Sequence, residues 1–177
     1  MPRHPVVCGG NMDPWRVVKD GDWTSFRLFR KHYSCRNKKP KTRQILGPGE
    51  KLVLVGRFVP ARSTAGNYLC GFRRSMFRRD DQEGVNLAVF RNADEACFEA
   101  SYLLRWAEAH AYKKWGSIRM FTFVDPPKIA SVNPGYCFKK AGWVLCGSTA
   151  KGLLVFEKTI EKTDMITGWH PWPELRA

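Results

Sequence analysis

The stretch NPGYCFKKAGW, residues 133–143, decides the fold that the sequence predicts. Its Asn-Pro-Gly start is typical of a turn that leads into a helix, and a glycine near its end suits the left-handed backbone that often follows a last helical turn. We therefore expect a short helix that ends at Gly142, with Trp143 as the first residue of the next strand. The upstream segment IRMFTFVD (118–125) is apolar and is closed by two prolines, which indicates a buried strand.

Outward from this stretch, the second half of the chain alternates between strands and helices. The segment 93–115 is expected to be the longest helix, because acids lie in its first turn, two lysines lie in its last turn and Gly116 follows it. Its expected apolar stripe consists of Ala96, Ala100, Leu103, Ala107 and Ala111. Strands are predicted at 51–60, 66–80 (with a bulge at Gly71), 85–92, 118–125, 143–149 and 152–158, the last two as a hairpin.

This order of elements predicts an α/β fold built on a central mixed sheet. A strand–helix–strand unit favours a parallel pair with the helix on one face, and a hairpin adds antiparallel neighbours. In the first half, DWTSFRLFRKHY (22–33) predicts a helix that Asp22 can cap. Its aromatic residues recur at three- and four-residue spacing, at Phe26, Phe29 and Tyr33.

The length of 177 residues suits one domain with a sizeable core. We place this domain at 22–158, between an N-terminal surface segment at 1–21 and a C-terminal tail at 159–177. No apolar run approaches the roughly 18 residues that cross a bilayer, and the N-terminus lacks an apolar signal core. The expected protein is therefore cytoplasmic, with no membrane partner. The six cysteines show no zinc-ligand spacing and are expected to be free thiols, most of them buried.

The charge is distributed unevenly along the chain. Residues 19–79 hold 16 Lys and Arg against 3 Asp and Glu, a net of +13, whereas residues 80–177 hold 12 of each kind, a net of 0. This asymmetry indicates that the first half meets a polyanion, and nucleic acid is the polyanion that fits best. The alternative is a basic surface that serves only solubility.

The order strand, long helix, strand, short helix and hairpin, with KKAGW (139–143) ending the short helix, resembles the GNAT (GCN5-related N-acetyltransferase) superfamily. LFRKHYS (28–34) is similar to the R-x-H-Y-S segment of phage Mom-like DNA-modification proteins, and VFRN (89–92) and NPGYCFKKAGW are similar to segments of phage proteins of the same type. The resemblance covers roughly residues 22–158. It implies a GNAT-like mixed sheet with a long helix after the fourth strand and a C-terminal hairpin. It also implies a transferase that modifies the exocyclic amine of adenine in DNA, which protects phage DNA from host restriction.

One departure from the family pattern leaves the identity of the cofactor open. Acetyl-coenzyme A enzymes of the superfamily carry a Q/R-x-x-G-x-G/A loop after the fourth strand, where backbone N–H groups bind a pyrophosphate. The corresponding stretch here, FRNADEACFEA (90–100), has no glycine, and Asp94 and Glu95 would repel a pyrophosphate. Acetyl-coenzyme A stays one open possibility for a donor that the sequence does not identify.

Four residues are candidates for catalysis: His32, Tyr33, Asp125 and Tyr136. An amine nucleophile loses a proton during transfer, and the imidazole of His32 is suited to accept it near neutral pH. The neighbouring phenol could donate to a leaving group, and Asp125 ends a central strand, where open α/β sheets place their ligands. Structural roles stay open as alternatives: an interfacial pair for His32 and Tyr33, and acceptance of backbone N–H groups in the following turn for Asp125.

Two further groups of residues are candidates for binding. Those expected to contact the donor or the acceptor base are Ser34, Asp81, Arg91, Asn92, Ser131 and Asn133. Ser131 or Asn133 could instead cap the next helix, and Asp81 could pair with arginines in a solvated turn. Those expected to contact a nucleic-acid backbone are Arg30, Lys31, Arg36, Lys38, Lys39, Lys41, Arg43, Arg73, Arg74, Arg78 and Arg79. No metal site is predicted.

The sequence thus favours an acyl- or alkyl-type group transferase that acts on nucleic acid, with DNA as the expected partner. Two alternatives stay open. One is a non-catalytic nucleic-acid-binding protein on the same fold, which the missing glycine loop favours. The other is an acetyl-coenzyme A-dependent N-acetyltransferase for another amine, which leaves the basic half of the chain without a role.

Overall fold

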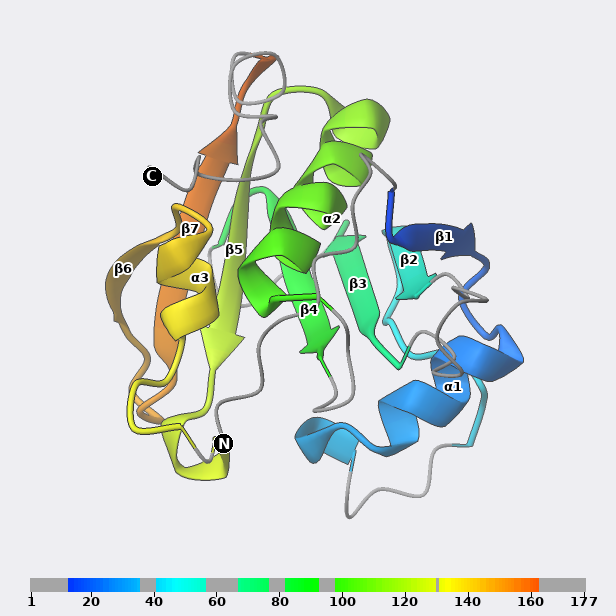
Figure 1. Cartoon of the computed structure of the whole chain (residues 1–177), viewed down its shortest axis with the longest axis horizontal. Helices are drawn as coiled ribbons and strands as arrows, with labels where there is room; N and C mark the ends of the chain where they lie inside the picture. The colour runs from blue at the N-terminus through cyan, green and yellow to red at the C-terminus, as the bar shows by residue number, and fades with distance from the viewer. Residues whose placement is uncertain are drawn as a thin grey trace, which may run out of the picture.

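The computed structural model describes residues 13–35, 41–56, 67–76, 82–92, 98–129 and 131–162, and these ranges form a seven-stranded mixed sheet with helices on both faces (Figure 1). The strands are β1 (Trp15–Val18), β2 (Glu50–Gly56), β3 (Leu69–Arg74), β4 (Val85–Arg91), β5 (Ile118–Val124), β6 (Val144–Ser148) and β7 (Leu154–Ile160). The helices are α1 (Trp23–Arg30), α2 (Ala100–Trp115) and α3 (Tyr136–Lys140), with 3-10 turns η1 (Tyr33–Cys35) and η2 (Pro126–Lys128).

The strand order is β1-β2-β3-β4-β5-β7-β6. β4 and β5 run parallel, and every other neighbouring pair is antiparallel. The single parallel pair lies on either side of α2 in the sequence, as the strand–helix–strand argument predicts. The mixed α/β sheet and the C-terminal hairpin are therefore confirmed.

Two apolar clusters lie on opposite faces of the sheet. The larger one packs α2 and α3 against inward-facing residues of β2 to β5 and β7, with Phe72, Leu103 and Phe156 fully buried. The smaller one packs Leu28 of α1 against the other face of β2, β3 and β4. Figure 1 shows α2 in front of the central strands with α3 beside it, and α1 apart from both.

A bulge in β4 reverses which face its side chains point to. Gly71 of β3 is paired with Val89, whereas the next residue, Phe72, is paired with Leu87, so Ala88 is the extra residue. Leu87 consequently belongs to the larger cluster and Val89 to the smaller one. The bulge was expected at Gly71, and the extra residue instead lies in the partner strand. A Cβ on Gly71 would contact Val89 closely, which explains why glycine stands opposite the bulge.

The helix near the N-terminus is shorter than expected and buries a different stripe. Asp22 caps α1, with its carboxylate accepting from the amides of Thr24 and Ser25 at 2.9 and 3.2 Å, as predicted. The helix then ends at Arg30, and Leu28 is buried whereas Phe26 and Phe29 are only partly buried. The aromatic stripe was wrong because Tyr33 lies in the 3-10 turn η1, outside the helical period on which the stripe depended.

The strand β1 lies within the segment that was expected to run over the surface. Trp15 is fully buried, and its indole N–H donates to the carbonyl of Leu103 in α2 at 2.9 Å. Tyr68 packs edge-on against Trp15 with ring centroids 5.0 Å apart. The core thus extends N-terminally to include an edge strand that no alternation in the sequence indicated.

A buried ion pair holds α3 and β7 against α2. Glu108 is 5% exposed, and its two carboxylate oxygens accept from Trp143 Nε1 at 2.6 Å and from Lys158 Nζ at 2.7 Å. Lys158 also donates to the carbonyl of Ala141 at 3.0 Å, one residue before the helix stop at Gly142. Burial raises the pKa of the Glu108 carboxyl, and the nearby Lys158 ammonium acts in the opposite direction.

Candidate active site

The parallel strands β4 and β5 separate toward their carboxyl ends and leave a cavity between them. They pair only at Val85 with Met120 and at Asn86 with Phe121. Beyond these pairs lies a cavity of about 300 Å³, walled by residues 87–90 of β4 and 122–124 of β5. Ligands of open α/β sheets bind at this edge, outside the carboxyl ends of the strands.

The separation begins at Thr122. Its hydroxyl donates to the carbonyl of Leu87 at 2.8 Å, so that a side chain replaces the backbone hydrogen bond that a regular ladder would make here. Past this point the peptide groups on the facing edges have no strand partner across the gap. Two of these groups have side-chain partners, since the Leu87 carbonyl accepts from Thr122 and the Phe90 carbonyl from His32, and the remaining ones can bind a ligand with its own donors and acceptors.

Two of the predicted catalytic residues close the cavity from the α1 side. His32, 7% exposed, and Tyr33 both line it, with ring centroids 4.2 Å apart. His32 Nδ1 lies 2.7 Å from the Ser34 hydroxyl and 3.3 Å from the Ser34 amide nitrogen, which donates to it. The other ring nitrogen therefore carries the proton and donates to the backbone carbonyl of Phe90.

Burial and the Arg91 guanidinium lower the pKa of His32 to about 4. The imidazole is consequently neutral at physiological pH, which is the form that accepts a proton. Both ring nitrogens are already engaged, however, and Ser34, whose hydroxyl holds Nδ1, is not among the residues that line the cavity, so His32 has to exchange a hydrogen bond before it accepts a proton there.

Tyr33 and Asp125 meet at the end of β5. Burial and the nearby Asp125 carboxylate raise the pKa of the Tyr33 phenol, while the backbone amide of Asp125 hydrogen-bonds to it and acts in the opposite direction. The Asp125 carboxylate also lies 2.7 Å from Lys128 Nζ in the 3-10 turn η2. Asp125 makes no side-chain cap to η2, so the structure places this carboxylate beside the phenol and not in the turn-capping role that was the alternative.

The remaining wall of the cavity comes from the loop before α3 and from its first residues. Ser131, Asn133 and Tyr136 all line the cavity, and the Tyr136 side chain is 56% exposed. The Ser131 hydroxyl accepts from the Asn133 amide at 3.2 Å, while the Asn133 side chain accepts from Lys139 at 3.4 Å. Neither caps α3, whose first turn follows Gly135 without a side-chain cap.

The structure also places the other predicted contact residues that it describes. Arg91 Nη1 donates to the Lys31 carbonyl at 3.4 Å, so this side chain bridges the end of β4 and the end of α1. Asn92 donates to the carbonyl of Phe98, and within the described residues its buried side-chain oxygen has no hydrogen-bond partner. Ser34 reaches the site through His32. Asp81, like Asp94 and Glu95 in the expected pyrophosphate loop, lies outside the described residues.

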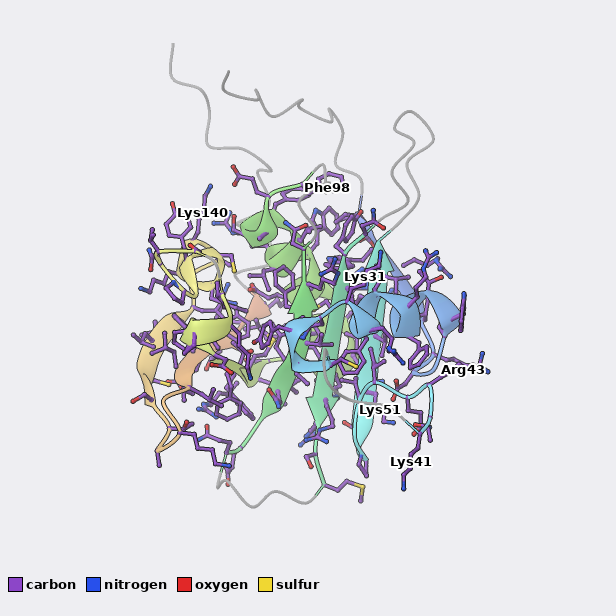
Figure 2. All side chains as sticks on the ribbon, turned by 90° about the horizontal axis from the view of Figure 1, so that it is seen from below. Lys31, Lys41, Arg43, Lys51, Phe98 and Lys140 are labelled. Carbon is purple, nitrogen blue, oxygen red and sulfur yellow. The ribbon has the colours of Figure 1, made fainter. Side chains whose placement is uncertain are left out.

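The basic residues that were expected to contact nucleic acid divide into three groups. Arg30, Lys31, Lys41 and Arg43 are exposed, and Figure 2 shows Lys31, Lys41 and Arg43 on the side of the molecule that α1 crosses. Arg73 and Arg74 lie at the far end of β3, where Arg73 packs on Gly47 and Arg74 pairs with Glu50 at 3.8 Å. The members that lie outside the described residues are Arg36, Lys38, Lys39, Arg78 and Arg79.

Among the residues of the site that were not predicted, three shape the cavity. Ala88 lines the cavity as the extra residue of the bulge, Thr122 bridges its closed end, and Gly135 packs its backbone against the Phe156 ring. Thr122 was visible as the one hydroxyl inside an apolar strand. Nothing in the sequence distinguishes Ala88, because a bulge depends on the register of two strands.

Within the described ranges, no group of three or more His, Cys, Asp or Glu side chains could hold a metal ion, and no helix has the length and apolar character needed to span a membrane. Four described cysteines are free thiols: Cys35 and Cys70 are buried, Cys137 is partly buried and Cys146 is exposed. Comparisons with protein-family models, with curated proteins and with solved structures find no match to this chain.

Proposed function

We propose that this chain is a GNAT-like transferase that moves a group from a small donor to an amine of nucleic acid, with the exocyclic amine of adenine in DNA as the expected acceptor. The cavity carries the proposal. His32 and Tyr33 come from the basic N-terminal part of the chain, and Asn133 and Tyr136 come from a segment about a hundred residues later, yet all four line one hollow.

The arrangement of elements supports the GNAT-like part of the proposal. One parallel pair, joined by the long helix α2, lies inside an otherwise antiparallel sheet, and a short helix that stops at Gly142 leads into the final hairpin. The sequence resemblance rested on the same order of elements. The cavity lies between the two parallel strands, past the last residues at which they pair.

The walls of the cavity favour an extended donor. Its sides are apolar at Leu87, Val89 and Phe123, and the unpaired strand edges supply peptide donors and acceptors. A donor whose reactive group sits on a slender arm with amide groups matches both features. Acetyl-coenzyme A carries such an arm and stays one candidate; the segment that would bind its pyrophosphate, residues 93–97, lies outside the described ranges.

The transfer itself needs little from the protein beyond position and proton handling. The acceptor nitrogen attacks the electrophilic carbon of the donor, a bond from nitrogen to that carbon forms, and the bond to the leaving group breaks. The nitrogen then loses a proton, and the leaving group takes one. In this proposal neutral His32, which lines the cavity, accepts the first proton, and the exposed phenol of Tyr136 supplies the second.

The charge distribution supports nucleic acid as the acceptor. Within the described residues, the three acids between positions 19 and 56 are all engaged: Asp20 with Lys51, Asp22 as the α1 cap and Glu50 with Arg74 and Trp115. The cations on the exposed side of α1 therefore present a positive surface beside the cavity. Such a surface attracts a phosphate backbone and leaves the chemistry to the adjoining site.

A second candidate is a nucleic-acid-binding protein without catalytic activity. Both ring nitrogens of His32 make hydrogen bonds, which favours this second candidate. A buried histidine with a purely structural role is likewise neutral and fully hydrogen-bonded. An N-acetyltransferase that uses acetyl-coenzyme A on another amine is compatible with the cavity but gives the basic surface no role.

Nucleoside mass spectrometry distinguishes these candidates. DNA and RNA from cells that express the soluble protein are digested to nucleosides and compared with those from cells that carry the empty vector. We expect a new, heavier deoxyadenosine derivative in the DNA only. A new nucleoside in RNA would identify RNA as the acceptor in place of DNA. No new mass in either nucleic acid would favour the non-catalytic binding protein. Resistance of the modified DNA to restriction enzymes tests the protective role.

A further inference from the structure

The exposed face of α1 carries one large aromatic side chain beside two arginines. Trp23 is 63% exposed, the most exposed tryptophan among the described residues. Arg27 and Arg30 follow it at spacings of four and three residues, which places all three on one side of the helix, opposite the buried Leu28. No described acid forms an ion pair with either arginine.

We propose that Trp23, with Arg27 and Arg30, forms a stacking platform for an unpaired nucleobase next to the cavity. This inference deepens the proposed function and rests on its nucleic-acid part. An indole face accepts any base by stacking, and flanking guanidinium groups hold the phosphates on either side of that base. An exposed tryptophan on this side of α1 fits no need of the fold, since the core is formed by the other face of the helix.

Neighbouring residues hold the Trp23 side chain in a position that suits binding. The Trp23 ring lies 6.2 Å from the Phe26 ring at an interplanar angle of 42°, so one side of the indole is supported while much of its surface faces solvent. Asp22, which precedes Trp23, is fixed as the helix cap. A side chain held in this way loses little conformational freedom when a base stacks on it.

The position of the platform relates it to the cavity. α1 begins at Trp23 and ends at Arg30, two residues before His32, which lines the cavity. A strand that follows the cations of α1 would therefore meet Trp23 at the start of the helix and the cavity beyond its end.

Single-stranded nucleic acid is the occupant that this surface fits, because a base inside a duplex offers no free face to stack. A duplex would meet the same surface through its phosphates alone. A protein partner with an acidic surface, or an anionic membrane that receives tryptophan and arginine at its interface, would use the charges but not the unpaired base.

Binding measurements on the purified full chain test the platform. The probes are a fluorescent single-stranded 20-nucleotide DNA, its RNA counterpart and the same DNA as a duplex. We expect Trp23→Ala to raise Kd for the single strands by about 5- to 150-fold and to leave duplex binding within about twofold. Trp23→Phe keeps a stacking ring and should stay close to wild type. Val144→Ala, at a residue 64% exposed on β6, is the matched control for loss of an exposed apolar side chain.

Salt dependence separates stacking from charge. Trp23→Ala should shift the affinity without changing the slope of log K against log salt concentration, whereas Arg30→Ala should reduce the slope by about 0.7 for one lost single-strand phosphate contact. The proposed platform is refuted if Trp23→Ala binds single strands as tightly as wild type, or if it weakens duplex binding equally. It is also refuted if Trp23→Ala abolishes binding to anionic vesicles while oligonucleotide binding is unchanged. If the wild-type chain binds no oligonucleotide at all, the nucleic-acid part of the proposed function fails together with the platform.

Discussion

Removal of the Lys158 ammonium should destabilise the protein far more than removal of a lysine from an equally short but exposed ion pair. Lys158→Met leaves the Glu108 carboxylate 5% exposed, with the indole N–H of Trp143 as its remaining hydrogen-bond partner among the described residues. Breaking a buried ion pair from one side costs about 3–5 kcal/mol, because a charge stays buried without compensation. The bond from Trp143 remains, so we expect the lower end, about 3 kcal/mol.

For a chain of 177 residues, about 3 kcal/mol corresponds to a fall in Tm of about 8 °C. The matched control is Lys140→Met. Lys140 Nζ lies 2.6 Å from Glu99, but the two side chains are 45% and 57% exposed. Exposed pairs contribute about 0–1 kcal/mol, so the control should lower Tm by at most about 3 °C.

Two further measurements test the physical cause. The double variant Glu108→Gln with Lys158→Met should regain much of the lost stability, because the amide is neutral and still accepts from Trp143. In Lys158→Met, lowering the pH from 8 toward 5 should also recover stability. The folded-state pKa of Glu108 lies above its unfolded value, so stability is lost as the pH rises from about 4.5 through the folded-state pKa. Equal effects of Lys158→Met and Lys140→Met in urea or thermal unfolding would refute this reasoning.

Two more predictions concern residues that line the cavity. The pKa of His32 is about 4 in the folded state and 6.5 in the unfolded state, so the unfolded chain binds more protons between these pH values. As the pH falls from 6.5 to 4, this residue therefore lowers the free energy of unfolding by up to about 3 kcal/mol. Unfolding curves of His32→Phe should lack this part of the pH dependence, and an identical slope in both proteins would show that His32 is not buried in its neutral form. Gly135 and Gly152 have φ of +82° and +78°, but a Cβ on Gly135 would overlap the Phe156 ring whereas nothing lies within 4 Å of one on Gly152. We expect Gly135→Ala to destabilise by about 1–3 kcal/mol more than Gly152→Ala in chemical denaturation, and equal losses would mean that only the left-handed backbone matters.

The elements whose signals are local were predictable from the sequence. The short helix α3 and its stop at Gly142, which has φ of +87°, follow from turn and stop residues within one segment. The hairpin of β6 and β7 and the parallel pair around α2 follow from apolar runs and from the order of elements. In each case a few neighbouring residues carry the information.

The features that depend on packing between distant segments were not predictable. Trp15 is buried because Tyr68 and α2 close over β1, and no short-range pattern marks a four-residue edge strand. The buried stripe of α1 was misread because aromatic spacing resembled a helical face, although Leu28 is the residue that meets β2 and β3. Propensity and periodicity rank the candidate faces of a helix, and tertiary contacts choose between them.

The candidate site shows the same division. The sequence singled out His32, Tyr33, Ser131, Asn133 and Tyr136, and the structure brings all five to one cavity. It could not indicate that the pKa of His32 falls to about 4, since that shift arises from burial and from Arg91 at the end of another strand. Nor could it locate the cavity itself, which exists because β4 and β5 stop pairing after Asn86 and Phe121.

The central claim is that the gap between β4 and β5 is where transfer occurs, and a variant that fills this gap tests it most directly. Ala88→Phe adds an aromatic ring to a cavity of about 300 Å³, and Ala150→Phe adds the same ring at an exposed position in the turn before β7. The measurement is the amount of new nucleoside in DNA from cells that express each soluble variant. The account predicts that Ala150→Phe matches wild type and that Ala88→Phe yields none; a wild-type amount from Ala88→Phe would contradict it.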